Sequence, residues 1–191
     1  ANTTGTYNVA VGNGTLSTNT IGKSNVAMGW GALANNTTGN YNTAIGAGES
    51  GVSFAAMQSS TTGSNNTAIG VAALGQASTA SYNTALGVGA GTSVSTGGYN
   101  TLLGYGAGTT GTNNLTTGTG NVVIGNNATP NAAGAVNRIV IGNGGIGQGD
   151  SYVSIGFGGT NYIYNLPTTN ATWTKASDER IKTNIQDLAI G

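Results

Sequence analysis

The sequence contains neither histidine nor cysteine among its 191 residues. It therefore lacks the usual ligand sets of zinc, haem and iron–sulfur sites, and it can form no disulfide bond, thiol nucleophile or histidine-based catalytic triad. We expect no metal site, no cofactor and no conventional enzyme active site.

Charge is also scarce. Charged residues make up 5% of the chain and the formal net charge is zero, whereas about 25% of an average domain is charged. A neutral chain offers little electrostatic attraction for nucleic acid, and no apolar run reaches the roughly 18 residues that a membrane helix needs. We expect neither nucleic-acid binding nor membrane insertion.

The few charges are unevenly distributed along the chain. Six of the ten lie in the last 17 positions, at Lys175, Asp178, Glu179, Arg180, Lys182 and Asp187. Such a change in composition predicts a boundary between two kinds of structure. We place a repeat region at residues 1–160, a connector at 161–176 and the start of a further domain at 177–191.

Glycine, in contrast, is abundant, with 35 residues, and much of it belongs to a repeat. The motif Asn-(Val/Thr)-Ala-aliphatic-Gly begins at Asn8, Asn25, Asn42, Asn66 and Asn83, with variants at Asn100, Asn121, Arg138 and Tyr152. The closing glycines are 17, 17, 24, 17, 17, 21, 17 and 14 residues apart. A basic period of 17 predicts a repeat architecture and argues against a disordered Gly/Thr/Asn-rich linker.

Each motif alternates in the manner of a short strand. In the first copy Val9 and Val11 share one face and Ala10 lies on the other. A second semi-apolar stretch, such as Gly31-Ala32-Leu33, suggests two short strands and two turns in every coil. The fold class is therefore predicted to be all-β, a parallel β-solenoid (β-roll) of about nine coils of basic period 17, with rungs about 4.8 Å apart.

The two faces of each strand lead to a prediction about assembly. We expect the aliphatic residues to form columns inside the coil and the motif asparagines to stack as an amide ladder. The small-residue face is then apolar without a partner in the same chain. Three chains intertwined as a homotrimer about an axis parallel to the stack would bury it.

Coils such as Asn25-Val-Ala-Met-Gly-Trp-Gly-Ala-Leu33 resemble the head repeats of trimeric autotransporter adhesins, the YadA-like β-roll, and more closely their longer-period version in bacteriophage tail fibres. The resemblance covers roughly residues 1–160, with a longer period than the adhesin coil and degenerate motifs from Asn121 onward. It implies an interlocked trimer in the extracellular virion tail, joined to upstream tail proteins, with further coils expected before Ala1.

A second resemblance lies at the end of the sequence. Ala176-Ser-Asp-Glu-Arg-Ile-Lys-Thr-Asn-Ile185 is similar to the opening of the intramolecular chaperone domain of phage tail fibres, tailspikes and endosialidases. That resemblance implies autoproteolysis in the full-length protein, with Ser177 as nucleophile and Lys182 as the assisting base. The alternative is that Ser177 only caps a helix.

Candidate receptor contacts come from aromatic residues and from the longest insertion. Tyrosines precede the motif asparagine at Tyr41, Tyr82 and Tyr99, and large aromatic residues follow the motif glycine at Trp30 and Tyr105. Such rings could stack on sugars or pack between coils. The extra length at Glu49–Gln58 adds Glu49 and Phe54, which we expect to form a glycan-facing rim with Trp30. Phe54 and Met57 could instead fill the trimer interior.

These observations favour a structural and receptor-binding part of a phage tail fibre that attaches the virion to a host-surface glycan or other receptor. The alternative is the head of a bacterial trimeric adhesin, which shares the coils but not the chaperone junction. An ice-binding solenoid would need two threonines, as Thr-x-Thr, on the same strand of successive coils. The motif strand offers one threonine per coil and often has valine instead. A glycan-cleaving tailspike would need two carboxylates about 5–10 Å apart, whereas Glu49 and Asp150 are about six rungs apart.

Overall fold

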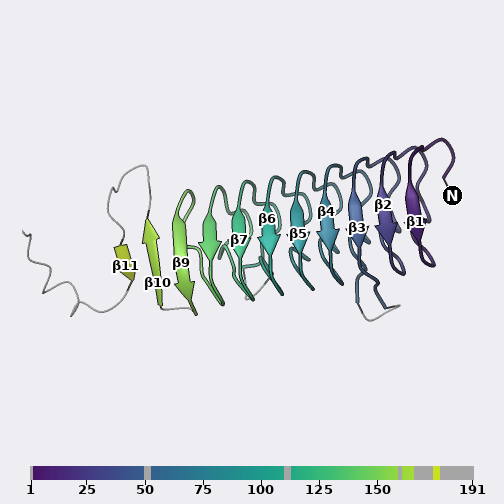
Figure 1. Ribbon diagram of the computed structural model, residues 1–191. Coiled ribbons are helices and arrows are strands. Elements are labelled where there is room, and N and C mark those ends of the chain that lie inside the picture. The colour runs from purple at the N-terminus through teal and green to yellow at the C-terminus, as the bar shows by residue number, and fades with distance from the viewer. Residues whose placement is uncertain (1, 50–52, 110–112, 159–160, 166–173, 177–191) are drawn as a thin grey trace, which may run out of the picture.

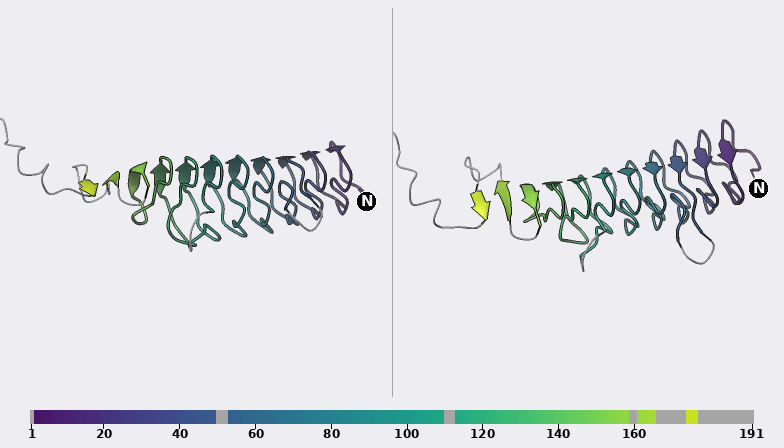
Figure 2. Two further views of the ribbon diagram at one scale, coloured as in Figure 1. Left: turned by 90° about the horizontal axis from the view of Figure 1, so that it is seen from below. Right: turned by 60° about the horizontal axis from the view of Figure 1, so that its bottom comes forward.

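The computed structural model describes residues 2–49, 53–109, 113–158, 161–165 and 174–176, and these ranges contain strands and turns but no helix. They form an elongated stack of coils with strands along one side (Figures 1 and 2). The strands are β1 (Val9–Val11), β2 (Val26–Met28), β3 (Thr43–Ile45), β4 (Thr67–Ile69), β5 (Thr84–Leu86), β6 (Thr101–Leu103), β7 (Val122–Ile124), β8 (Ile139–Ile141), β9 (Val153–Phe157), β10 (Asn161–Asn165) and β11 (Thr174–Ala176).

Strands β1 to β9 occupy the nine motif copies and pair in parallel, each with the next along the chain. Equivalent residues stack directly, as Ala27 does on Ala44. Across the 24-residue interval Thr43 still pairs with Thr67, because the extra residues leave the coil as a loop. The predicted all-β parallel solenoid of period about 17 is confirmed.

The two faces of each strand are oriented opposite to our prediction. From β2 to β8 the central residue points inward and is fully buried, at Ala27, Ala44, Ala68, Ala85, Leu102, Val123 and Val140. The aliphatic residue beside it points outward, and Met28 is 44% exposed. The 17-residue coil is narrow, so across most of the stack its interior accepts only a small strand residue opposite the bulkier residue of the following turn.

Side-chain volumes compensate one another across this narrow interior. Where the strand contributes alanine, the opposing column contributes Leu33, Met57 or Leu74, all fully buried. At β6 the strand contributes Leu102 instead, and the opposing column holds glycine both in that coil, at Gly108, and in the coil before it, at Gly91. A Cβ atom at Gly91 would collide with the Leu102 side chain. In the close-packed interior, the size of the strand residue and the size of the opposing residue are therefore matched to each other.

The second strand predicted for each coil is absent from the described coils. Leu33 and Leu74 have φ angles of 50° and 49°, in the left-handed region that a strand cannot use. Their backbones nevertheless bond from coil to coil, since the Leu74 N–H donates to Ala90 O at 2.9 Å. One strand and a set of stacked turns therefore complete each coil.

The motif glycine meets two separate requirements. Gly70 has a φ of 133°, which is strained for any residue with a side chain. A Cβ atom there would also lie 2.5 Å from the carbonyl oxygen of Gly87 in the next coil. Glycine thus lets the chain turn sharply after each strand while adjacent backbones remain in contact.

The motif asparagines form the predicted ladder. Asn42 Oδ1 accepts hydrogen bonds from the backbone and side-chain amides of Asn66, at 3.0 and 3.1 Å. The Asn42 side-chain amide donates to Gly63 O at 2.8 Å. The ladder continues to Asn121, whose Oδ1 accepts from the backbone N–H of Arg138. These side chains satisfy polar groups in the narrow interior that water cannot reach.

The direction of pairing changes at the C-terminal end of the sheet. Strand β10 pairs antiparallel with β9, placing Ile163 opposite Ile155, and β11 pairs antiparallel with β10. We assigned these residues to a connector and predicted no strands in it. The sheet therefore extends past the last coil (Figure 1).

Candidate binding surface

The outer face of β1 to β9 is an apolar strip without charged side chains. Its aliphatic column holds Val11, Met28, Ile45, Ile69, Leu86, Leu103, Ile124, Ile141 and Ile155, of which five are at least 40% exposed. A second column, two residues earlier, holds valine, threonine or isoleucine. Eight steps of about 4.8 Å make this outer strip about 38 Å long. Contiguous apolar surface of this size is typical of an interaction site.

Aromatic residues lie along both edges of the outer strip. We call the edge where β1 to β9 begin the upstream edge and the edge where they end the downstream edge. Tyr41, Tyr82 and Tyr99 precede their strands, whereas Trp30 and Tyr105 follow theirs. The predicted contact residues therefore form two groups on opposite edges of the sheet.

The upstream tyrosines occupy a strained backbone position. Tyr7, Tyr41, Tyr82 and Tyr99 all have φ between 57° and 61°, while the same column accepts asparagine at Asn65 and glycine at Gly120. The left-handed region costs a residue with a side chain about 1–2 kcal/mol. Asparagine or glycine would suit this backbone better, so the backbone conformation does not explain why tyrosine occurs at four of these positions.

Stacking within the column accounts for one pair. The rings of Tyr82 and Tyr99 lie parallel, with centroids 4.8 Å apart and an interplanar angle of 1°. Packing between coils, one of our two readings of the tyrosines, therefore holds for this pair. Tyr41 has no ring neighbour in the adjacent coils, which place Ser24 and Asn65 beside it, and it is 65% exposed.

The long insertion leaves the downstream edge after β3 (Figure 1). Trp30 O accepts from Gly48 N, and Phe54 O accepts from Ala72 N, so the seven extra residues are 48–54. The predicted span of 49–58 was too long at its end, because Gln58 belongs to the regular coil and bonds to Asn35.

Within this insertion, Glu49 and Ser53 pair through both backbone N–H groups at 3.1 Å. Glu49 is exposed, and Phe54 is 38% exposed with its side chain against Gly75. Met57 is fully buried in the core of its own coil, so it does not point towards a partner chain. Trp30 is half-buried, and Tyr105 on the same edge is exposed.

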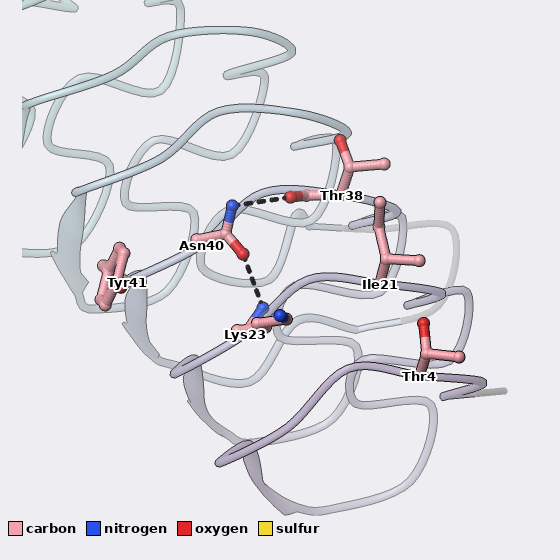
Figure 3. A pocket seen from close by; sticks show the side chains of 6 residues that line it. All are labelled: Thr4, Ile21, Lys23, Thr38, Asn40 and Tyr41. Atoms are coloured by element: carbon pink, nitrogen blue, oxygen red, sulfur yellow. Dashed lines mark hydrogen bonds between the residues drawn. The ribbon is translucent and has the colours of Figure 1, made fainter.

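A shallow groove of about 470 Å³ lies at the upstream edge near the N-terminal end (Figure 3). Its lining comes from three successive coils and consists of Thr4, Ile21, Lys23, Thr38, Asn40 and Tyr41. Asn40 braces the groove, since its Oδ1 accepts from Lys23 N at 2.8 Å and its Nδ2 donates to Thr38 O at 3.0 Å. Sequence reasoning missed the groove, although Lys23 is the only cation before Arg138.

Other polar chemistry is sparse in the described residues. Arg138 forms an ion pair with Asp150 at 2.7 Å and donates to Pro130 O. The bond that Asp150 accepts from the backbone of Val136, with a further one from Arg138, lowers the pKa of this carboxyl. No cluster of three metal-binding side chains and no helix long enough to cross a membrane occurs among the described residues. Ser177 and Lys182 lie outside the described residues.

Comparisons of the chain with protein-family models, with curated proteins and with solved structures found no match.

Proposed function

We propose that this chain is the structural and receptor-binding part of a phage tail fibre, working as a homotrimer that attaches the virion to a host-surface glycan or other receptor. The observation that supports it most is the uncharged, exposed outer strip along β1 to β9. A rigid stack with one long apolar face suits a shaft built from several parallel copies.

The proposed interface differs from the one that the sequence suggested. The face that carries alanine is buried inside the coils from β2 onward, so it needs no partner chain there. The aliphatic and threonine columns take its place as the surface that needs a partner. Because coils stack in register over β1 to β9, a parallel copy can repeat the same contact at each rung, and many small contacts add up along the shaft.

The oligomeric state tests this proposal. We expect light scattering to give three times 18.6 kDa for the chain. Replacing Leu86 and Leu103 together by lysine should dissociate the assembly, because each lysine would place an unpaired charge in the buried contact between chains. The matched control is Thr79→Lys with Thr96→Lys, which places the same charges on exposed positions away from the outer strip. A wild-type monomer would contradict the proposal.

Attachment is tested on the virion. The purified chain should compete with phage for host cells and slow their adsorption, whereas the dissociated Leu86 and Leu103 variant should compete poorly. Full adsorption in the presence of excess trimer would contradict a receptor-binding role. The bacterial adhesin alternative is distinguished by the flanking sequence, since it requires a downstream membrane anchor instead of a virion-attachment domain.

We propose no enzymatic activity for the coils. Glu49 follows β3 on the downstream edge, whereas Asp150 precedes β9 on the upstream edge and pairs with Arg138. A glycosidase needs two carboxyl groups about 5–10 Å apart, and this placement separates the two by the width of the sheet and several rungs. An ice-binding face gains little support, because threonine occupies one of the two outward positions in β3 to β6 only and neither of them in the other strands of the stack.

A further inference from the structure

The aromatic column at the upstream edge contains a gap. Tyr7, Ser24 and Tyr41 occupy successive coils, linked by hydrogen bonds from Ser24 N to Thr6 O and from Tyr41 N to Lys23 O. The three residues share nearly the same left-handed backbone, with φ of 61°, 56° and 57°. A serine therefore stands where a third tyrosine would complete the stack.

The size of this gap follows from the stacked pair further along. Tyr82 and Tyr99 show that rings in this column lie parallel at the rung spacing, 4.8 Å apart. Tyr7 and Tyr41 are two rungs apart, which is about 9.6 Å. One flat ring placed over Ser24 would lie about 4.8 Å from each tyrosine, within the usual range for ring stacking.

Polar groups border the gap on the side of the groove. Lys23 precedes Ser24, and its backbone is held by Asn40. Among the described residues the Lys23 ammonium has no salt-bridge or hydrogen-bond partner. The nearest acidic residue in the sequence, Glu49, lies at the opposite edge of the sheet. Figure 3 shows Lys23 between Tyr41 on one side and Thr4 and Thr38 on the other.

We infer that this gap and groove bind an acidic saccharide. One sugar ring of the saccharide stacks against Tyr41 over Ser24, a carboxylate or phosphate group pairs with Lys23, and hydroxyl groups of an adjoining sugar bond to Thr4 and Thr38 on the other side of Lys23. An aromatic ring recognises the C–H face of a sugar, and an unpaired ammonium on a surface with few other charges selects an anion. The inference rests on the proposed attachment function and names its ligand class, at a contact separate from the insertion.

The test is an array that carries uronic-acid, sialic-acid and phosphosugar glycans beside neutral glycans of matched backbone. We expect the wild-type chain to bind acid-bearing glycans, and the array to show whether carboxylate or phosphate is preferred. Lys23→Gln should weaken binding at least tenfold. Tyr41→Ser, which introduces a residue already used in this column, should do the same.

Two further variants make the test specific to the gap. Ser24→Tyr should complete the stack and abolish binding while leaving the fold intact, because this backbone position already accepts tyrosine in four coils. Ser151→Tyr is the matched control, since it adds a ring at the equivalent left-handed position of a distant coil (φ 66°) and should leave glycan binding unchanged. Melting temperature and mass are measured for each variant.

Several results would overturn the inference. These are no binding to any acidic glycan, a preference for the neutral glycans, or acidic-glycan binding that survives Lys23→Gln or Ser24→Tyr. Dissociation of the assembly by Tyr41→Ser would instead assign the ring to contacts between chains. Failure of the proposed function is distinguishable, because it would appear as a wild-type monomer or as phage adsorption unaffected by the purified chain.

Discussion

At the scale of single residues, the amide ladder shows how a narrow coil deals with buried polar groups. Each motif asparagine bonds to the coils on both sides, as Asn66 does with Asn42 and with Asn83. A shorter second ladder runs through Asn2, Asn19 and Asn36. It stops at Ser60, where the Asn36 Oδ1 and Ser60 Oγ atoms are buried without hydrogen-bond partners.

The two ladders predict opposite outcomes for similar truncations. Asn66→Ala should lower the free energy of unfolding by about 2–4 kcal/mol, because it leaves buried amides of two neighbouring coils unpaired. Ser60→Ala should change it by less than about 1 kcal/mol or stabilise the chain, since it removes an unsatisfied hydroxyl and Ala77 already holds this position one coil later. Denaturant unfolding measures both.

Equal destabilisation by the two changes would mean that the ladder bonds contribute nothing beyond packing. Ser60→Asn is a useful third variant, because it would extend the second ladder by one rung and give the Asn36 oxygen a donor.

At the scale of the coil, the structure shows that the glycine after each strand cannot be replaced, whereas the length of the turn after it can vary. Glycine after each strand is required, because a side chain at Gly70 would strain the turn and meet the next coil. Extra length after Ala47 is tolerated, since Thr43 and Thr67 remain paired across it. Insertions at this corner can therefore vary without moving the core.

Removing residues 48–54, so that Ala47 joins Ala55, should restore the 17-residue spacing and preserve the fold. We expect an unchanged oligomer and a melting temperature within a few degrees of the wild type, because no residue of the buried core is lost. Adsorption to host cells should weaken, since Glu49 and Phe54 leave the downstream edge. Circular dichroism, light scattering and an adsorption assay test these expectations.

An unfolded deletion variant would show that the loop helps to close its coil. Adsorption at the parental rate by a folded trimer would show that the insertion is a spacer and makes no receptor contact. The shorter deletion of residues 50–52 serves as the matched control, because it keeps Glu49 and Phe54 in the chain at the downstream edge while shortening the loop.

At the scale of the whole molecule, the two ends of the stack differ. The N-terminal and central coils rely on the asparagine ladder, whereas the last coils rely on Arg138, which contacts Pro130 and Asp150. Charge-assisted contacts thus replace amide bonds where the parallel sheet approaches its antiparallel end at β10. Acid should therefore affect the two ends differently.

The Asp150 carboxyl has a pKa lowered from 3.8 in the folded chain. A lowered pKa adds stability above the unfolded value, about 3.9, and that contribution is lost as the pH falls through the folded value. We expect the coils around β8 and β9 to open first below about pH 4. Amide hydrogen exchange, corrected for intrinsic rates, measures this opening. In the wild type the coils around β8 and β9 should exchange faster below pH 4 than at pH 5. In Asp150→Asn the same coils should exchange equally at both pH values.

Acid opening that begins at β1 to β3, or an Asp150→Asn profile identical to that of the wild type, would contradict this account. Glu49→Gln is the control, because that carboxyl lies in the insertion and takes no part in the contact with Arg138.

The repeat pattern was enough to predict the parallel solenoid, the position of the motif strand in each coil and the asparagine ladder, but it also predicted a second strand per coil that the structure does not have. A period of 17 with one asparagine, one alternating segment and one glycine per coil allows few arrangements other than stacking in register. The pattern could not decide which face of Val26-Ala-Met28 points inward, because both faces are apolar. The coil cross-section decided it, since the interior has room for Ala27 opposite Leu33 but not for Met28.

The same limit applies to the candidate binding residues. Exposed aromatic residues could be found along the chain, but their separation onto two edges depends on where each strand begins and ends. The groove joins Thr4, Lys23 and Tyr41 across three coils, a proximity that appears only when residues 17 apart stack at the rung spacing. Tertiary structure therefore decided the composition of each site, because it places residues distant in the chain side by side.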